Sequence, residues 1–463
     1  MDGHQKPFTH SAWILIALLV AGIAFLQVIP EPERDELGED PAGFVIMRLQ
    51  SQYMLGLATL TDQRREIATS ASILDMGTVG QRQRYMAFMI TLGEPEAAKK
   101  SALRMRVALE QVGRELSEQQ ATTQEMIDIL AAGGSLKSGH ATLSNQLGWF
   151  GTLLEADDSK LKEIESAAAT KVLLVGLICL GIFLAGVVGF IGIIFFTIRA
   201  CTGSMQSGMN PPSKHHGIYS EVFALWLVVF LALTMLAGNL GRTFAKDNAT
   251  LAMAFILFAF FLSLSALYWA RFRGVSMEQL KADIGWNTGS GFIKEIAHGV
   301  LGYAMMLPLL GIGMVLTMIL MLLQQFFTGG PESDPFAGTG GGAHPIIVDI
   351  ANGGWQLRIL LFTLAAVAAP IVEETMFRGV LYRQLRTSSN LFDHAISIIG
   401  SVLIVSFLFA AIHPQGWIAI PALMGIAIGM NLMREWRGSI LPSMVVHGLS
   451  NGLVISVMLI FLS

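Results

Sequence analysis

Apolar residues form long runs along most of this chain, and polar residues gather between the runs. A helix needs roughly 20 apolar residues to cross the hydrocarbon core of a bilayer. Five runs meet this requirement, at about 11–29, 172–198, 222–241, 250–270 and 299–327. Four later segments are apolar enough to span but are short or contain polar residues, at about 356–382, 395–413, 416–433 and 440–461. The pattern predicts an all-α, polytopic transmembrane helical bundle of about nine spans.

Residues 31–170 differ from the rest, because they carry many charges of both signs. Within them, Leu, Met and Val mix with Arg, Glu and Gln at helical spacing over 102–129, and 131–134 supply a break before a further helix. We expect two or three long antiparallel helices here. They would form an extracytoplasmic helical domain inserted after the first span.

The basic residues indicate how the spans are oriented. Short cytoplasmic segments of membrane proteins carry an excess of Lys and Arg. With the N-terminus inside, the inner segments hold Lys6, Arg199, Lys214, Arg271, Arg273, Lys281, Lys294, Arg383, Arg386, Arg434 and Arg437. The short outer segments hold only Arg242, Lys246 and Arg358. We therefore expect a multi-pass protein, in a cell membrane, with a cytoplasmic N-terminus.

The chain divides into four parts on this basis. Residues 1–30 form an N-terminal anchor, which we expect to be retained because residues 27–30 offer no small-residue cleavage site. Residues 31–170 form the outer domain, and 171–294 add further spans and cytoplasmic loops. Residues 295–463 hold the last spans, where the candidate chemistry lies.

Composition agrees with a membrane protein and excludes several other classes. Only 14% of residues are charged and 53% are hydrophobic, whereas soluble domains have about 25% charged residues. The net charge of −4 shows no basic excess for nucleic acid. Two cysteines are too few for a disulfide framework. The lipid bilayer is the one partner that composition itself implies.

Polar and ionisable side chains gather late in the chain, within its apolar segments. Such groups cost roughly 2.5–3.5 kcal/mol each at the centre of a span, so each needs a partner or a purpose. The cluster consists of Glu373, Glu374, Arg378, His413, His447 and Asn451.

Helical spacing relates these residues to one another. Arg378 lies four residues after Glu374, so the two can pair on one side of a helix. Glu373 then remains free, and it points about 100° away from its neighbour. His447 and Asn451 share one face of the ninth span.

These residue types suit peptide hydrolysis. A carboxylate beside an imidazole can take a proton from water and later deliver it to a leaving amine. An imidazole N–H and an Asn amide can donate to a developing oxyanion. The same Glu and His types can instead bind zinc and leave a position open for water. The residues alone do not separate these two mechanisms, so cofactors are either none or zinc.

Three motifs resemble the CAAX protease and bacteriocin-processing family of intramembrane endopeptidases, which includes the type II CAAX prenyl endopeptidase. Its Glu-Glu-x-x-x-Arg motif is present as Glu373, Glu374 and Arg378. Its Phe-x-x-x-His motif is present as Phe409 and His413. Its His-x-x-x-Asn motif is present as His447 and Asn451. The resemblance covers about 295–463.

The resemblance implies a peptidase that acts on a membrane-embedded or lipidated protein or peptide. It implies that Glu373 is the general base and acts with His413 on water, without metal. His447 and Asn451 would then stabilise the oxyanion. Glu374 and Arg378 would orient the site.

Two other functions use the same residues. A non-catalytic scaffold or sensor would bind an external partner through 31–170, and the polar cluster would only stabilise the bundle. Glu374 with Arg378 would then fasten helices, and Asn451 would be an interhelical hydrogen bond. A transporter could use Glu373 as a proton relay, but we find no inverted internal repeats.

Two further expectations concern packing. Gly425 and Gly429 have the spacing of small residues at a close helix contact. Straight, full-length spans would put His413 and His447 at opposite surfaces. An active site therefore requires a chain break at Pro414 within the protein interior, together with either strongly tilted helices or an interfacial start near 390–394.

Overall fold

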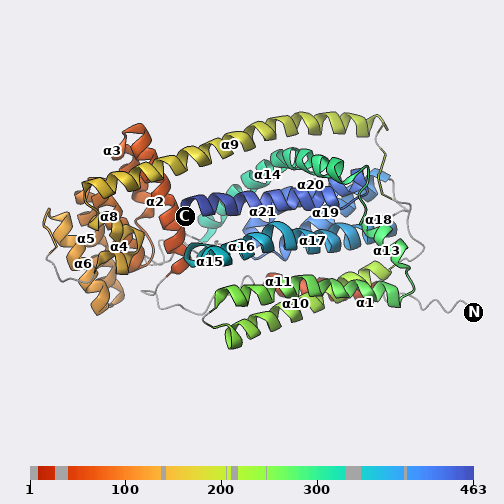
Figure 1. Cartoon of the computed structure of the whole chain (residues 1–463), viewed down its shortest axis with the longest axis horizontal. Helices are drawn as coiled ribbons and strands as arrows, with labels where there is room; N and C mark the ends of the chain where they lie inside the picture. Colours follow the sequence, from red (N-terminus) through yellow and green to blue (C-terminus); the bar gives the residue numbers. More distant parts are fainter. Residues whose placement is uncertain are drawn as a thin grey trace, which may run out of the picture. The chain divides into compact units, whose positions relative to one another are not determined.

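The structure is a computed structural model that describes residues 9–26, 40–136, 142–204, 206–209, 217–246, 248–328, 346–389 and 394–462. All regular structure in these residues is helical, which confirms the all-α class (Figure 1). Nine described helices are long and apolar enough to cross a membrane, as the sequence predicts. They are Thr9–Leu26, Asp158–Cys201, Ile218–Phe244, Ala249–Phe272, Phe292–Gln324, Trp355–Ser388, His394–Ala411, Trp417–Arg437 and Leu441–Leu462.

The chain divides into two compact units. The apolar unit contains the described parts of Met1–Ile29, Leu180–Leu323 and Gly353–Ser456. The helical unit contains the described parts of Pro30–Cys179, Gln324–Asn352 and Val457–Ser463.

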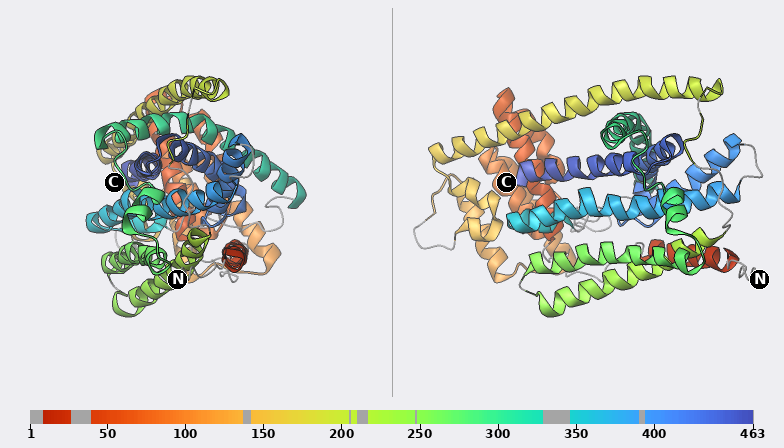
Figure 2. Two further views of the ribbon diagram at one scale, coloured as in Figure 1. Left: turned by 90° about the vertical axis from the view of Figure 1, so that its right-hand side faces the viewer. Right: turned by 45° about the vertical axis from the view of Figure 1, so that its right-hand side comes forward.

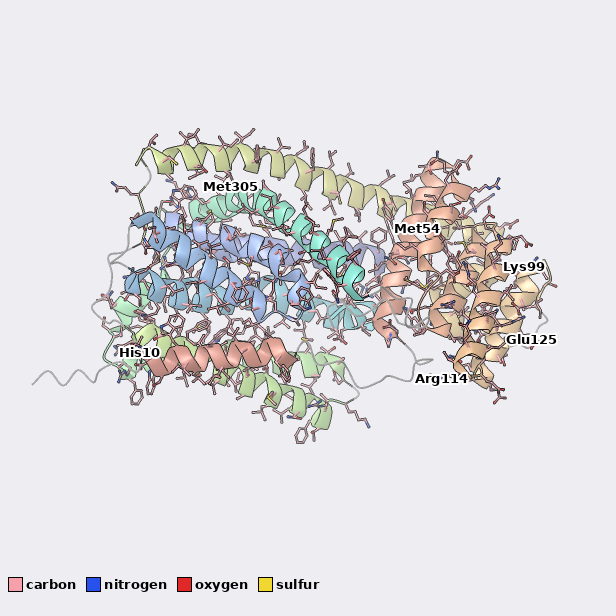
Figure 3. All side chains as sticks on the ribbon, turned by 180° about the vertical axis from the view of Figure 1, so that it is seen from behind. His10, Met54, Lys99, Arg114, Glu125 and Met305 are labelled. Atoms are coloured by element: carbon pink, nitrogen blue, oxygen red, sulfur yellow. The ribbon has the colours of Figure 1, made fainter. Side chains whose placement is uncertain are left out.

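The helical unit is built from many helices, of which α2 has 21 residues and α5 has 18, around its own apolar core. They are α2 (Pro41–Thr61), α3 (Arg64–Ser70), η1 (Ala71–Leu74), α4 (Val79–Thr91), α5 (Pro95–Val112), α6 (Glu118–Ala131), α7 (Leu143–Leu147), α8 (Trp149–Glu155), the first part of α9 (Asp158–Cys201) and α15 (Ile346–Asn352). Met86, Phe88 and Met105 are fully buried in the core. Lys99 of α5 and Glu125 of α6 point away from it (Figure 3).

The expectation of two or three long helices in this region is wrong, because the periodic stretch 102–129 is interrupted. Helix α5 ends at Gly113, whose φ of 65° is the left-handed conformation that glycine adopts most readily. Ser117 then caps α6 through a capping box with Gln120. The same side-chain periodicity continues on both sides of this turn, so the pattern looked continuous.

The apolar unit holds the remaining helices. They are α1 (Thr9–Leu26), the second part of α9, α10 (Ile218–Phe244), α11 (Ala249–Ser263), η2 (Leu264–Leu267), α12 (Tyr268–Phe272), α13 (Met277–Ile284), α14 (Phe292–Thr328), α16 (Trp355–Thr363), η4 (Leu364–Ala368), α17 (Ala369–Glu374), η5 (Thr375–Leu381), α18 (Tyr382–Ser388), α19 (His394–Ala411), η6 (Trp417–Ala419), α20 (Ile420–Arg437) and α21 (Leu441–Leu462). Helices α10 and α11 lie side by side (Figure 1), and α1 packs against α10 (Figure 2).

Small residues set the closest helix contacts in the apolar unit. A Cβ atom on Gly425 would lie 2.6 Å from the Leu309 carbonyl oxygen, and one on Gly429 would lie 2.9 Å from the Met306 Cβ atom. Helix α20 therefore packs against α14 through these glycines, which confirms the packing expected from their spacing. A similar approach brings Gly192 of α9 near Met305 of α14 (Figure 3).

Candidate active site

The two adjacent glutamates lie in the middle of a 34-residue helix, Trp355–Ser388. This helix contains two π-helical segments, η4 and η5, and the short α17 between them ends at Glu374. Each π-helical turn accommodates an additional residue, and such segments are frequent at functional sites. The glutamates are therefore held between two local changes in helical phase.

Glu374 is engaged by two side chains. Its Oε1 atom accepts from Arg378 Nη1 at 2.9 Å and lies 2.9 Å from His447 Nδ1. The side chains of Glu374 and Arg378 are completely buried, and that of His447 is nearly so. The structure thus contains the ion pair that the four-residue spacing predicts, and it adds a histidine from α21.

Glu373 has a different environment. Its Oε2 atom lies 3.7 Å from His413 Nε2 and 3.9 Å from His447 Nε2. Within the described part of the chain, this buried oxygen has no hydrogen-bond partner. The side chain retains 16% of its exposure, whereas Glu374 retains none. Glu373 is therefore the less enclosed carboxylate and the one that two imidazoles face.

The contacts of the two Nδ1 atoms indicate which nitrogen of each imidazole carries the hydrogen. His413 Nδ1 lies 2.6 Å from the Phe409 carbonyl oxygen, which can only accept, so Nδ1 carries the hydrogen. His447 Nδ1 likewise faces the Glu374 carboxylate. In the neutral form, both rings then direct an unprotonated Nε2 atom toward Glu373.

Three acceptors therefore face one another at distances beyond a direct hydrogen bond: Glu373 Oε2, His413 Nε2 and His447 Nε2. A polar separation of this size is suited to a bridging water, whose two hydrogens can be donated to the acceptors. This arrangement can hold a water and remove a proton from it.

The geometry was also compared with that of a zinc site. Nitrogen and oxygen ligands at 2.0–2.1 Å from a tetrahedral zinc lie about 3.3 Å apart. The two separations here are wider. Among the residues that the structure describes, no group of three or more His, Cys, Asp or Glu side chains is placed to hold a metal ion. We therefore derive no step through a metal.

Phe409 forms the apolar wall of the cluster. Its ring centroid lies 4.2 Å from that of His413 and 5.8 Å from that of His447. The Arg378 guanidinium carbon lies 4.5 Å from the same centroid, within the range of a cation–π interaction. Phe409 thus contacts three of the candidate site residues as well as orienting His413 through its carbonyl.

Asn451 has a separate partner. It lies one turn after His447 on α21, and its Nδ2 atom donates to the Ala365 carbonyl oxygen at 2.8 Å. The structure thus places five of the six candidate residues in one contiguous cluster. It connects the sixth to the backbone that precedes the glutamates.

The histidines meet despite the conflict expected for straight spans. Helix α19 ends at Ala411, so His413 and Pro414 lie in the turn that precedes η6. The helix that carries the glutamates has 34 residues, well beyond the roughly 20 needed for a perpendicular crossing. The distances of 3.7 and 3.9 Å from Glu373 Oε2 to His413 and His447 show that the end of α19 and the second turn of α21 meet at this residue.

Buried ion pairs elsewhere in the apolar unit serve as a comparison. Arg383 Nη2 lies 2.7 Å from Asp283 Oδ1, and Arg386 binds Glu435 at 3.0 and 3.1 Å. These carboxylates also accept from Tyr hydroxyls, at 2.6 Å for Asp283 and 2.8 Å for Glu435. Burial of a charged group is thus common here. What distinguishes Glu373 is that, among the described residues, its nearest charged or polar partners are two imidazoles rather than a directly paired guanidinium.

Sequence reasoning overlooked Pro370 and Ala365, which shape the backbone before the glutamates. A proline within an apolar, otherwise helical segment is the signal that identifies such a position, because proline lacks the N–H that a helix requires. It also overlooked Trp286, whose Nε1 atom donates to Thr375 Oγ1 at 3.0 Å in η5.

The fold and cluster define a polytopic, multi-pass membrane protein with a buried Glu/His site. Residues 355–453 match the family model described as Type II CAAX prenyl endopeptidase Rce1-like. This segment is similar to Rce1-like domains, which is consistent with the CAAX protease and bacteriocin-processing family and supports a protease at family level. It contains all six candidate residues. No curated protein and no solved structure matches the chain.

Proposed function

We propose that this protein is an intramembrane endopeptidase that hydrolyses a peptide bond of a membrane-embedded or lipidated substrate. The observation that carries the proposal is the convergence of one carboxylate with two imidazoles, with Glu373 Oε2 at 3.7 and 3.9 Å from the Nε2 atoms of His413 and His447. The Rce1-like match over the same residues supports it.

In this mechanism, Glu373 and His413 accept hydrogen bonds from one water, and Glu373 takes its proton. The resulting hydroxide attacks the carbonyl carbon of the substrate. When the tetrahedral intermediate collapses, the C–N bond breaks and the proton passes to the leaving amine. General acid–base catalysis of this kind contributes about 10²–10⁴-fold to a rate.

His447 is the candidate oxyanion donor, whereas the amide of Asn451 already donates to the Ala365 carbonyl. To donate from Nε2, His447 must carry a hydrogen on that nitrogen, and the contact of its Nδ1 atom with Glu374 fixes the orientation of the ring. Arg378 balances the charge of Glu374. These two residues therefore orient the site rather than react.

The regions outside the Rce1-like segment receive separate roles. We propose that the helical unit lies outside the cell membrane and binds a partner or recruits substrate, since it has its own core and lies outside the matched residues. The bias of Lys and Arg toward one set of loops supports a cytoplasmic N-terminus.

The test compares cleavage of a lipidated peptide library by purified wild type, Glu373→Ala and His413→Ala. Glu278→Ala serves as a matched control, because this glutamate is exposed on α13. We expect both site variants to lose at least a hundredfold in rate with an unchanged unfolding temperature, and the control to cleave normally. A folded wild type that cleaves nothing would favour the scaffold or sensor.

A further inference from the structure

The Ala365 carbonyl lies where its own helix lacks a donor. In η4 the Ala369 N–H donates to the Leu364 carbonyl, five residues back. If the same five-residue spacing continued, the next hydrogen bond would run from the N–H of residue 370 to the Ala365 carbonyl. That residue is Pro370, which has no N–H. The Ala365 carbonyl therefore lacks the backbone donor that the five-residue spacing would give it.

Asn451 supplies the missing donor from another helix, at 2.8 Å. Helix α21 can approach this closely because residue 448 is glycine. A Cβ atom on Gly448 would lie 2.7 Å from the Ala366 carbonyl oxygen, well inside van der Waals contact. In an apolar environment an unpaired backbone carbonyl is costly, so this hydrogen bond stabilises the π-helical segment where it lies.

The position of that segment determines where the glutamates point. A π-helical turn adds one residue, and successive helical residues point about 100° apart. Gain or loss of the turn before α17 would rotate every following side chain by about the angle that separates Glu373 from Glu374. The phase of η4 therefore decides which carboxylate faces the two Nε2 atoms.

We infer that Asn451 is a positioning residue. Its amide compensates for Pro370, fixes the phase of η4 and so directs Glu373 toward His413 and His447. Together with the contact between His447 and Glu374, it gives α21 two points of attachment on either side of Pro370. This inference rests on the proposed function for the role of Glu373, but the attachment itself is measurable without catalysis.

A disulfide reports the attachment. A Cβ atom on Gly452 would lie 3.5 Å from the Ala366 Cβ atom, within the range of about 3.5–4.5 Å found across disulfides. Ala366→Cys and Gly452→Cys are introduced into a full-length chain in which exposed Cys179 and Cys201 are replaced by Ser. The rate of disulfide formation under mild oxidant is then measured.

We expect rapid cross-linking in this background and at least tenfold slower cross-linking when Asn451→Ala is added. Ser450→Ala is the matched control, because its hydroxyl donates within its own helix, to the Val446 carbonyl at 2.9 Å. It should leave the rate unchanged. Glu373→Ala should also cross-link normally, since it removes the proposed base and not the attachment.

Cleavage is measured in the same proteins without the added cysteines. Positioning predicts that Asn451→Ala lowers kcat at least tenfold with KM unchanged, and that the unfolding temperature falls because the Ala365 carbonyl loses its donor. If Asn451→Ala did not slow the cross-linking, the inference would be overturned. A loss of kcat would then indicate a direct contact of Asn451 with the reacting atoms. Slow cross-linking by Asn451→Ala, combined with a wild type that cleaves nothing, would retain the attachment and reject the peptidase.

Discussion

The imidazole of His447 contacts both adjacent glutamates. Its Nδ1 atom lies 2.9 Å from Glu374 Oε1, and its Nε2 atom lies 3.9 Å from Glu373 Oε2. The first contact is a hydrogen bond that orients the ring. The second leaves room for a water or a reacting group. One histidine thereby links a structural carboxylate to a candidate catalytic one.

This difference predicts separate effects for two conservative variants. Glu373→Gln should lower kcat at least a hundredfold, because an amide cannot take a proton from water. Its unfolding temperature should match that of wild type, since Glu373 Oε2 has no hydrogen-bond partner within the described residues. Glu374→Gln should lower the unfolding temperature, because it removes the carboxylate that is directly paired with buried Arg378. Steady-state kinetics and thermal unfolding of both proteins check this.

Equal kinetic losses with equal unfolding temperatures would contradict the assignment. They would mean that the carboxylates share one role. A larger kinetic loss for Glu374→Gln at full stability would exchange the two roles.

The buried ion pair makes a prediction about stability. Removing one partner of a buried pair typically costs about 3–5 kcal/mol, because a buried charge is left unpaired. Arg378→Met should therefore lower the free energy of unfolding by about this amount. Glu374→Leu combined with Arg378→Met should recover most of the loss, since neither charge remains. Denaturant unfolding in detergent measures both.

The control is Arg242→Met, which replaces an exposed arginine of α10. It should change the free energy of unfolding by less than about 1 kcal/mol, as for exposed pairs in general. A double variant no more stable than Arg378→Met would show that Glu374 acts mainly through His447.

The sequence predicted the apolar unit well and the helical unit poorly, for a physical reason. A span is defined by mean apolarity over about 20 residues, a property that tolerates local irregularity. The helices of the helical unit instead end at single residues. Gly113 and Ser117 interrupt a periodic stretch, and the apolar face resumes beyond them. Their capping signals were present but weaker than the periodicity around them.

The candidate site shows the same division. The pair of Glu374 and Arg378 follows from spacing within one helix, so the sequence could predict it. The contact of His447 with Glu374 depends on the register between two helices, which close contacts such as that at Gly448 determine. The phase change around Pro370 also depends on a partner from another helix, Asn451. No spacing within one segment contains that information.

Gly448 provides a test of this register. A methyl group at Gly448 would meet the Ala366 carbonyl at 2.7 Å, so Gly448→Ala must push α21 from the segment that carries the glutamates. We expect a loss of about 1–3 kcal/mol in the free energy of unfolding, typical of overpacking, and a loss of cleavage. Gly400→Ala on α19 is the control, because nothing lies within 4 Å of its added methyl group. If both variants behaved like wild type, the close approach of α21 would be wrong.

Chelation tests the metal-free mechanism. The separations of 3.7 and 3.9 Å between Glu373 Oε2 and the two Nε2 atoms exceed the roughly 3.3 Å between ligands of a tetrahedral zinc. The site would have to contract to bind zinc, whereas it fits a bridging water without change. We expect wild-type cleavage to stay within twofold after prolonged treatment with a zinc chelator, under conditions that inactivate a zinc protease assayed in parallel. Loss of cleavage that added zinc restores would instead make Glu373, His413 and His447 metal ligands. In that case Glu373→Ala and His413→Ala should also abolish zinc binding by the purified protein. Equilibrium dialysis measures this binding independently of cleavage.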